Sequence, residues 1–268
     1  MPKTRCCGYF ASLNGEEKSD GATYISNAVE VYFNPVSGSK DCNGQEGCMH
    51  WYLYSVKDDY VNMLLDHNIT EAEATNGRWA QESDYNDESA ASAGITYPGV
   101  SVIPEYGSSF YYDDTTYRAH SKNARGPVTA LNTLKLLTSE WNGTQTPIVP
   151  NSSNMNEYII TKDKNYNKYQ IDYTGYKARS ITYEETGYLG CSMSANSCPL
   201  WMTDNIYSSE APKGYWTSTA CSDDDSNFDA WGFVSSGGVF RHEVFDLNYG
   251  VRPVITVKIT DVLTEPLS

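Results

Sequence analysis

The fold is decided by the stretch GYWTSTACSDDDSNFDAWGFVSSGGVFRHEVFDLNYGVRPVITV, which runs from Gly214 to Val257. Both ends of this stretch are rich in β-branched and aromatic residues, which predicts stiff, half-buried strands. Its middle is polar, acidic and aromatic, and it contains Phe228, Phe233, Phe240 and Phe245. Aromatic and small polar residues on loops that a rigid frame holds are typical of binding surfaces. We therefore interpret the chain as a recognition module first and an enzyme second.

The composition of the whole chain predicts a folded protein and excludes some partners. The chain has 268 residues, of which 40% are hydrophobic and 20% charged, enough to bury a core. Its 22 tyrosines suit either a β-rich fold or a contact surface. A formal net charge of −15 argues against nucleic acid and against anionic membrane surfaces as partners. No apolar run approaches the roughly 18 residues that would predict a membrane span.

The seven cysteines include two pairs that close short loops rich in Gly, Ser and Asn. Cys42 with Cys48, and Cys191 with Cys198, have spacings that suit local disulfides in an oxidising compartment. Free thiols are the alternative, whereas a zinc site more typically shows Cys-x-x-Cys pairs or paired His. We therefore expect an extracellular protein whose leader or anchor lies outside this sequence.

Alternating and β-branched runs predict strands along the chain, and two sets of turn residues predict hairpins. Asp58-Asp59 would join the second strand to the third, and Ser235–Gly238 would join two strands of the C-terminal third. Pro253 marks an edge or a bulge in the last strand. The predicted strands are Thr23–Phe33, Met49–Lys57, Tyr60–Asp66, Tyr158–Thr161, Gly214–Ser218, Ala230–Val234, Gly238–Phe245 and Val251–Thr260, with a short hairpin around Tyr97–Val102.

Three stretches predict helices. After Pro127, apolar residues recur at helical spacing at Ala130, Leu134, Leu137 and Trp141, and Gly143 predicts the end of that helix. Thr182 and Glu185 have the spacing of a capping box, which predicts the start of a short helix. A further short helix or turn is expected after Pro199.

Motifs of catalysis and metal binding are weak in this chain. It contains no nucleophile elbow, no zincin motif, no phosphate-binding loop and no dinucleotide-binding glycine motif. Asp223, Asp224 and Asp225 with Asp229 are of the type that ligates Ca²⁺, although a solvated acidic loop is the interpretation that we favour. For His67 at a strand end, we expect hydrogen bonds to loop backbone. We therefore predict no cofactor, no metal and no catalytic residue.

Four pieces of the C-terminal stretch carry a family resemblance. They resemble the C-type-lectin-like fold in the branch that formylglycine-generating enzymes share with the variable proteins of diversity-generating retroelements. Pieces further upstream are similar to surface proteins of gut Firmicutes. The C-terminal pieces are Gly214–Ser218, Ala230–Trp231, Gly237–Val239 and Tyr249–Val254. The upstream pieces are Val31–Gly38, Gly47–Tyr52, Val61–Thr70, Gly126–Trp141 and Tyr176–Glu185.

The resemblance implies an α+β protein with a small antiparallel sheet, two or three helices and long loops. We expect residues 1–22 to form an N-terminal tail and residues 23–268 a single C-type-lectin-like domain, with an insertion at about 78–124. The variable, ligand-binding segment would span about 214–257. We also expect the N- and C-terminal strands to pair with each other. Tyr215, Trp216, Trp231 and Arg252 would form the buried or half-buried frame.

In retroelement variable proteins, adenine-directed mutagenesis varies one face while the frame is kept. Asn codons mutated in this way cannot yield Lys, Gln, Met, Trp or Glu. Between Ser222 and Tyr249 the chain has no Lys, Gln or Met, and it has a single Glu (Glu243) and a single Trp (Trp231). We assign Trp231 to the frame, whereas Glu243 departs from the pattern.

We predict that the function is display of a diversified recognition surface at the cell surface or on a phage particle. Its partner would be a protein or glycan on another cell or particle, and the oligomeric state stays open. One alternative is a pilin-like or adhesive surface protein of fixed specificity. Another is an oxidase of the formylglycine-generating type, with a close, reducible pair among Cys191, Cys198 and Cys221 beside a groove. The predicted ligand-binding residues are Ser222, Asp223, Asp224, Asp225, Ser226, Asn227, Phe228, Phe233, Ser235, Phe240, Arg241, His242, Phe245, Asp246 and Asn248.

Overall fold

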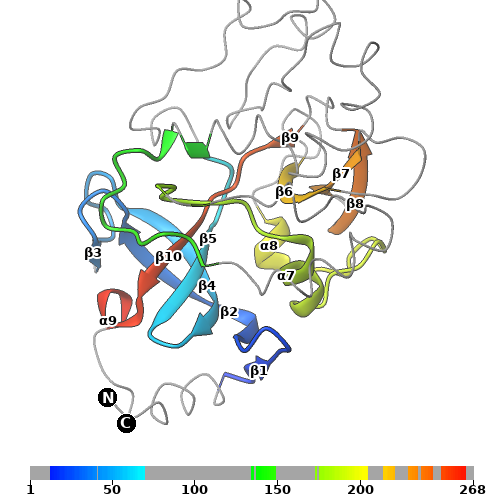
Figure 1. Cartoon of the computed structure of the whole chain (residues 1–268), viewed down its shortest axis with the longest axis horizontal. Coiled ribbons are helices and arrows are strands. Elements are labelled where there is room, and N and C mark those ends of the chain that lie inside the picture. Colours follow the sequence, from blue (N-terminus) through cyan, green and yellow to red (C-terminus); the bar gives the residue numbers. More distant parts are fainter. Residues whose placement is uncertain are drawn as a thin grey trace, which may run out of the picture.

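The computed structural model describes residues 13–40, 42–69, 134–135, 137–148, 173, 175–204, 214–220, 229–234, 237–243 and 249–263 (Figure 1). For residues 220, 229–234 and 241–243 it describes the backbone alone. The strands are β1 (Glu16–Glu17), β2 (Thr23–Asn34), β3 (Ser39–Lys40), β4 (Met49–Lys57), β5 (Tyr60–Leu65), β6 (Gly214–Ala220), β7 (Asp229–Val234), β8 (Gly238–Glu243), β9 (Tyr249–Gly250) and β10 (Val254–Lys258). The named helices are α7 (Tyr183–Tyr188), α8 (Leu200–Thr203) and α9 (Ile259–Val262).

The larger sheet has six strands in the order β1-β2-β4-β5-β10, and β3 also pairs with β2. All of these pairs are antiparallel. The predicted hairpin at Asp58-Asp59 is confirmed, since Lys57 pairs with Tyr60 across it. Asp58 has a φ of 54°, a left-handed conformation that Asp tolerates better than most residues. A bulge interrupts β2 between Tyr24 and Val29.

One face of the larger sheet carries the first core cluster. Trp51 and Leu53 of β4 are completely buried there, and Trp51 meets Trp141 edge to face with ring centroids 5.9 Å apart. Leu134, Leu137 and Trp141 are all buried in this cluster, as their helical spacing predicts. Ala130 lies outside the described residues. Burying each such side chain stabilises the fold by about 1.5–3 kcal/mol.

The segment around α7 is held by a buried ion pair. The capping box is confirmed, because Thr182 Oγ1 accepts from Glu185 N–H and the Glu185 carboxylate accepts from Thr182 N–H. That carboxylate also pairs with Arg179, with both side chains fully buried and Nη2 2.6 Å from Oε1. Tyr54 of β4 donates its hydroxyl to Glu185 at 2.8 Å. The helix start is therefore anchored directly to the larger sheet.

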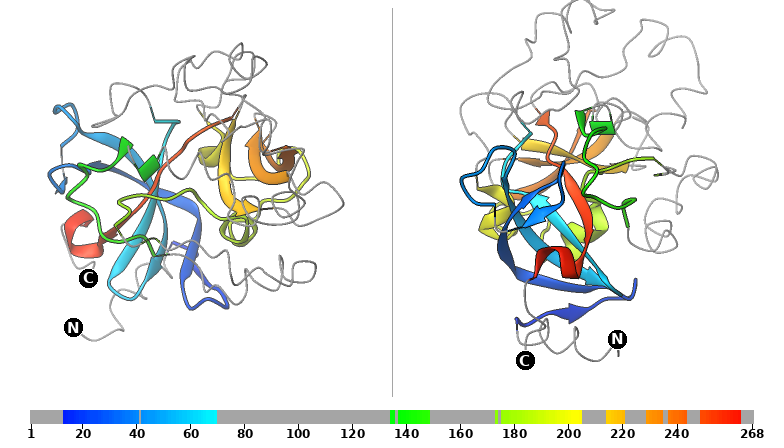
Figure 2. Two further views of the ribbon diagram at one scale, coloured as in Figure 1. Left: turned by 45° about the horizontal axis from the view of Figure 1, so that its top comes forward. Right: turned by 90° about the vertical axis from the view of Figure 1, so that its left-hand side faces the viewer.

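The smaller sheet has four strands in the order β8-β7-β6-β9, in which β6 and β9 run parallel. Figure 2 shows this sheet beside the larger one. The second core cluster joins the two sheets: Tyr24, Tyr54 and Leu64 of the larger sheet share it with Tyr215 and Val239 of the smaller one. Leu189 after α7 and Met202 of α8 complete this cluster, so the short helices pack where the sheets meet.

Three expectations about the chain ends need correction. The last strand begins at Val254, not Val251, and it ends at Lys258, where α9 follows. Among the strands that the structure describes, those nearest the N- and C-termini do not pair: β10 pairs with β5, and β1 and β2 lie nearer the opposite edge of the sheet. β1 lies within the stretch assigned to an N-terminal tail, and Glu16 pairs with Tyr24 of β2.

The coarse fold class is confirmed as α+β, with antiparallel pairing dominant and short helices. Within the part of the chain that the structure describes, no helix has the length and apolar character needed to cross a membrane. The predicted strand at Tyr158–Thr161, the hairpin around Tyr97–Val102 and the insertion at about 78–124 all lie outside the described residues.

Candidate functional site

The predicted frame of the C-terminal stretch is buried. Tyr215 and Trp216 of β6 are 0% and 1% exposed. The Tyr215 hydroxyl donates to the Met202 carbonyl at 2.9 Å, and the Trp216 ring packs on Tyr249 with centroids 4.8 Å apart. Burial raises the pKa of Tyr215 above its ordinary value, and the nearby charge of Arg252 offsets only part of this rise. Tyr215 and Trp216 are therefore parts of the scaffold, as expected, whereas the side chain of Trp231 is not described.

Arg252 ties the end of the larger sheet to α8. Its guanidinium is completely buried and donates to four backbone carbonyls: Leu65 at the end of β5, Asp66 directly after it, and Trp201 and Met202 in α8. The donor–acceptor distances to Asp66 and Met202 are both 2.6 Å. Burial lowers the pKa of Arg252. The carbonyls supply the negative charge density that a buried cation needs. The Arg252 guanidinium also lies over the Tyr215 ring of β6, with its carbon 5.2 Å from the ring centroid.

The pairing of β6, β7 and β8 brings two polar segments to one end of the smaller sheet. Ala220 at the end of β6 pairs with Ala230, and Asp229 at the start of β7 pairs with Glu243 at the end of β8. Residues 221–228 therefore leave and rejoin the sheet at this end, whereas residues 244–248 leave it here and rejoin it at Tyr249, which pairs with Gly214 at the opposite end. Ten of the predicted ligand-binding residues belong to these segments and lie outside the described residues: Ser222, Asp223, Asp224, Asp225, Ser226, Asn227, Phe228, Phe245, Asp246 and Asn248.

The register of β7 and β8 sorts the remaining predicted positions into rows. Position 233 pairs with Tyr215 and Val239, whose side chains are both fully buried. Position 240 pairs with Gly232, which in turn pairs with Trp216. Because successive residues of a strand face opposite sides, positions 240 and 242 belong to one side of the sheet and position 241 to the other. Phe240 itself is half-buried, and the side chains of Arg241 and His242 are not described.

The opposite end of the hairpin rests against a cysteine loop. Cys191 and Cys198 form a disulfide with Cα atoms 4.2 Å apart, and Cys42 and Cys48 form another with Cα atoms 5.6 Å apart. Both predicted local disulfides are thus present. The amide of Cys198 donates to Gly237 and the amide of Val239 donates to Ser192. Ser235, which follows the last residue of β7 at this end, lies outside the described residues.

An imidazole–carboxylate cluster at the end of β5 is a feature that the sequence did not single out. The Asp66 carboxylate accepts from Nδ1 of both His50 and His67, with the His50 contact at 3.0 Å. Burial raises the pKa of Asp66. The hydrogen bonds and charges of His67 and His50 together lower it by more than burial raises it, so the pKa of Asp66 is below its ordinary value. The His67 side chain contacts Asp66, and its expected hydrogen bonds to loop backbone stay a prediction.

Aromatic rings surround this cluster. Tyr32 stacks on His50 with ring centroids 5.0 Å apart, and the Tyr52 ring lies tilted to His50 with centroids 5.1 Å apart. His50 Nε2 is 3.4 Å from Glu30 Oε2, without a hydrogen bond between them. Among the described residues, no group of three or more His, Cys, Asp and Glu side chains is arranged to hold a metal ion. The cluster joins β4 to the end of β5 through the contact between His50 and Asp66.

Comparisons with known proteins give no relative. No family model, no curated protein and no solved structure matches the chain.

Proposed function

We propose that this protein is a ligand-binding display protein with a C-type-lectin-like fold. Its recognition surface would be built where residues 221–228 and 244–248 leave the smaller sheet. The observation that carries the proposal is the pairing of Asp229 with Glu243, which sends both polar segments from one end of the sheet. A buried frame of Tyr215, Trp216 and Arg252 holds that sheet. Loops that a rigid scaffold presents together are the usual site of recognition.

The chemistry of the two segments supports a protein or glycan partner. Residues 222–228 contain three consecutive Asp with Ser, Asn and Phe, and residues 244–248 add Phe245, Asp246 and Asn248. Aromatic rings provide contact area at a low cost in conformational entropy, and carboxylates orient cationic or hydroxyl-rich groups. The two disulfides fit an oxidising, extracellular compartment. Display at the cell surface or on a phage particle is part of the proposal.

A binding measurement with paired charge variants tests this function. The full chain is applied to glycan and extracellular-protein arrays as wild type and as the triple variant Asp223→Ser, Asp224→Ser, Asp225→Ser. The control is Asp58→Asn, Asp59→Asn, which changes the exposed turn between β4 and β5. We expect the triple variant to lose its array signals and the control to keep them. Equal signals from both variants would contradict the proposed surface.

The oxidase alternative retains one supporting observation. It calls for a close, reducible cysteine pair beside a groove, and Cys191 and Cys198 are close enough to form a disulfide. Incubation of the protein and copper with a cysteine-containing peptide, followed by mass spectrometry, tests this alternative. Conversion of the peptide cysteine to formylglycine would establish the oxidase, and loss of that conversion in Cys191→Ser would place the chemistry at this pair.

A further inference from the structure

We propose that the disulfide loop, Cys191–Cys198, positions the β7–β8 hairpin, and that reduction of its disulfide by a thiol releases the hairpin. Throughout, "the hairpin" means Asp229–Glu243. The consequence for ligand binding rests on the proposed function, whereas the positioning itself does not. Three independent sets of contacts carry the inference.

Backbone hydrogen bonds form the first set of contacts. β8 is an edge strand of the smaller sheet, so among the described strands none pairs with the outer side of its backbone. The disulfide loop occupies this side at the start of β8: Val239 N–H donates to Ser192 O at 3.2 Å, and Cys198 N–H donates to Gly237 O at 3.0 Å. The loop thus acts as a short substitute for a neighbouring strand, at the point where the hairpin turns.

Close backbone approach is the second set of contacts. A Cβ atom at Gly238 would lie 2.9 Å from the Ser194 carbonyl oxygen, closer than real Cβ atoms come to other atoms. A Cβ atom at Gly237 would lie 3.2 Å from the Asn196 Cα. The consecutive glycines Gly237 and Gly238 therefore allow the disulfide loop to lie directly against the hairpin backbone. A change in the path of the loop reaches the hairpin without an intervening side chain.

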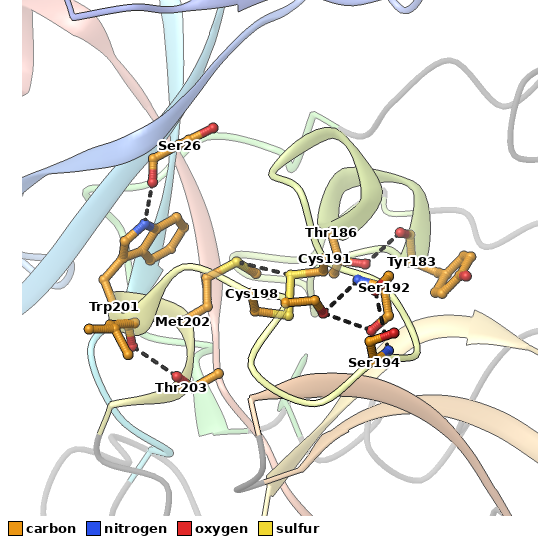
Figure 3. Close-up of a disulfide and its surroundings, with 12 residues drawn as sticks. Ser26, Tyr183, Thr186, Cys191, Ser192, Ser194, Cys198, Trp201, Met202 and Thr203 are labelled. Atoms are coloured by element: carbon orange, nitrogen blue, oxygen red, sulfur yellow. Dashed lines mark hydrogen bonds between the residues drawn. A yellow bond between two sulfur atoms is a disulfide. The ribbon is translucent and has the colours of Figure 1, made fainter.

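The third set of contacts runs from the disulfide to the buried frame. Cys191 Sγ lies 3.7 Å from Met202 Sδ (Figure 3). The Met202 side chain is completely buried, and its carbonyl accepts from both Tyr215 and Arg252. The Cys191 amide also donates to Thr186 O at the end of α7. The disulfide therefore packs against Met202 of α8, whose carbonyl is hydrogen-bonded to Tyr215 of β6 and to Arg252 between β9 and β10.

The disulfide loop depends on its covalent closure. Residues 192–196 are exposed, and the loop is polar apart from Met193 and Ala195. Its internal bonds are made by serines: Ser197 Oγ accepts from Ser192 N–H at 2.8 Å and donates to Ser192 O at 3.0 Å. Such bonds to water-accessible groups are readily exchanged for water. Opening the disulfide returns conformational freedom to the loop, which weakens its contacts with Gly237 and Val239.

The reduction is a two-electron thiol–disulfide exchange. A thiolate of a dithiol reductant attacks Cys191, the more exposed of the two cysteines, and the Cys191–Cys198 bond breaks with Cys198 as leaving thiolate. The second thiol of the reductant resolves the mixed disulfide. The protein gains two electrons and two protons as two thiols, and the reductant becomes a disulfide.

Hydrogen–deuterium exchange of the full chain tests the positioning without a ligand. The samples are wild type, Cys191→Ser/Cys198→Ser, and the control Cys42→Ser/Cys48→Ser, which removes the other disulfide. We expect the first variant to exchange amides of residues 237–243 faster by about tenfold, with β2, β4 and β5 unchanged. The control should leave residues 237–243 as in wild type. Unchanged exchange in these residues, or an equal rise throughout the chain, would overturn the proposal.

Wild-type protein treated with dithiothreitol gives a second route that does not require the variant to fold. Peptide mapping identifies samples in which Cys191–Cys198 is reduced, and exchange at Val239 should rise with the reduced fraction. Array binding of oxidised and reduced protein then separates the two proposals. Loss of array signals on reduction supports both. Faster exchange without array signals in either state supports the positioning and contradicts the proposed function, and unchanged exchange on full reduction contradicts the positioning.

Discussion

At the scale of single residues, buried charges are the most sensitive points of this molecule. Arg179 and Glu185 are both fully buried. The Glu185 carboxylate also accepts hydrogen bonds from the Tyr54 hydroxyl and from the Thr182 amide. Burial lowers the pKa of Arg179, but the charge of Glu185 raises it well above its ordinary value. A pair of this kind costs little while it is complete and a great deal when one partner is lost.

The variant Glu185→Gln tests this ion pair. It keeps the size of the side chain and leaves the Arg179 guanidinium buried without a countercharge, so the free energy of unfolding should fall by about 3–5 kcal/mol. Urea denaturation measures this change. The double variant Arg179→Met/Glu185→Leu should recover most of the loss, because both charges are then absent. A single variant as stable as wild type would contradict the role given to the pair.

The Asp66 cluster predicts a pH dependence. The pKa of Asp66 is held below its ordinary value of 3.8 by His67 and His50 despite its burial. A lowered folded-state pKa stabilises the fold above pH 3.8, and that stabilisation is lost as the pH falls through the folded-state pKa. Asp66→Asn should therefore lower the free energy of unfolding by about 1–3 kcal/mol at pH 7, and the difference from wild type should vanish in strong acid.

Urea denaturation from pH 7 down to pH 2 measures the Asp66 effect. Asp58→Asn is the matched control, because it removes one carboxylate from an exposed turn whose left-handed backbone suits Asn. A difference between Asp66→Asn and wild type that persists unchanged in acid would contradict the assignment.

At the scale of elements, some contacts between segments need a glycine, because a side chain at that position would collide with the neighbouring backbone. The helical segment ends at Leu137, earlier than predicted, and Gly143 lies in the turns that follow it, where its amide donates to Pro35 O at 2.8 Å. A Cβ atom at Gly143 would collide with the Gly38 backbone and lie 2.9 Å from the Pro35 oxygen. We expect Gly143→Ala to destabilise the fold by about 1–3 kcal/mol, because backbone on both sides must shift.

Thermal unfolding of Gly143→Ala beside Gly187→Ala measures this contact. Gly187 lies in α7, where an added Cβ atom would meet nothing within 4 Å, so its replacement should be neutral or slightly stabilising. Equal melting temperatures for the two variants would contradict the close approach of the 143 and 38 backbones.

Arg252 holds β5 and α8 together through its hydrogen bonds to carbonyls of both segments. Arg252→Lys keeps the charge but replaces the planar fork that reaches four carbonyls with a single ammonium group. We expect a loss of about 3 kcal/mol in the free energy of unfolding. Lys57→Arg, at a partly exposed position, is a control for the exchange of these two residue types. An unchanged Arg252→Lys variant would contradict its role as a clamp.

The elements of the larger sheet could be predicted from the sequence, but their register could not. Alternation predicted β2, β4 and β5 and the turn at Asp58-Asp59. Counting outward from the Lys57–Tyr60 pair would place Trp51 opposite Asp66. A register shift between Leu53 and Ser55 instead pairs Trp51 with Leu65, which brings His50 to Asp66. The shift depends on how both faces of β4 are packed. The hydrophobic pattern of each strand taken alone therefore could not predict the contact between His50 and Asp66.

At the scale of the whole molecule, the sequence predicted the frame better than the way in which the chain ends meet. Tyr215, Trp216 and Arg252 are buried as expected, because aromatic and β-branched surroundings predict burial locally. The pairing of β10 with β5 rather than with the N-terminal strand depends on long-range packing across the larger sheet. Likewise, the cysteine spacing predicted a disulfide at Cys191–Cys198 but not the contact of its loop with Gly237 and Val239.

The central proposal is that residues 222–228 and 244–248, held by the buried frame of the smaller sheet, form a diversified recognition surface. Deep sequencing of the last third of its gene from one growing population tests that claim most directly. We expect substitutions at adenines within codons 222–228 and 244–248, with Tyr215, Trp216, Tyr249 and Arg252 unchanged. An invariant segment, or substitutions spread equally over the frame codons, would contradict a diversified recognition surface.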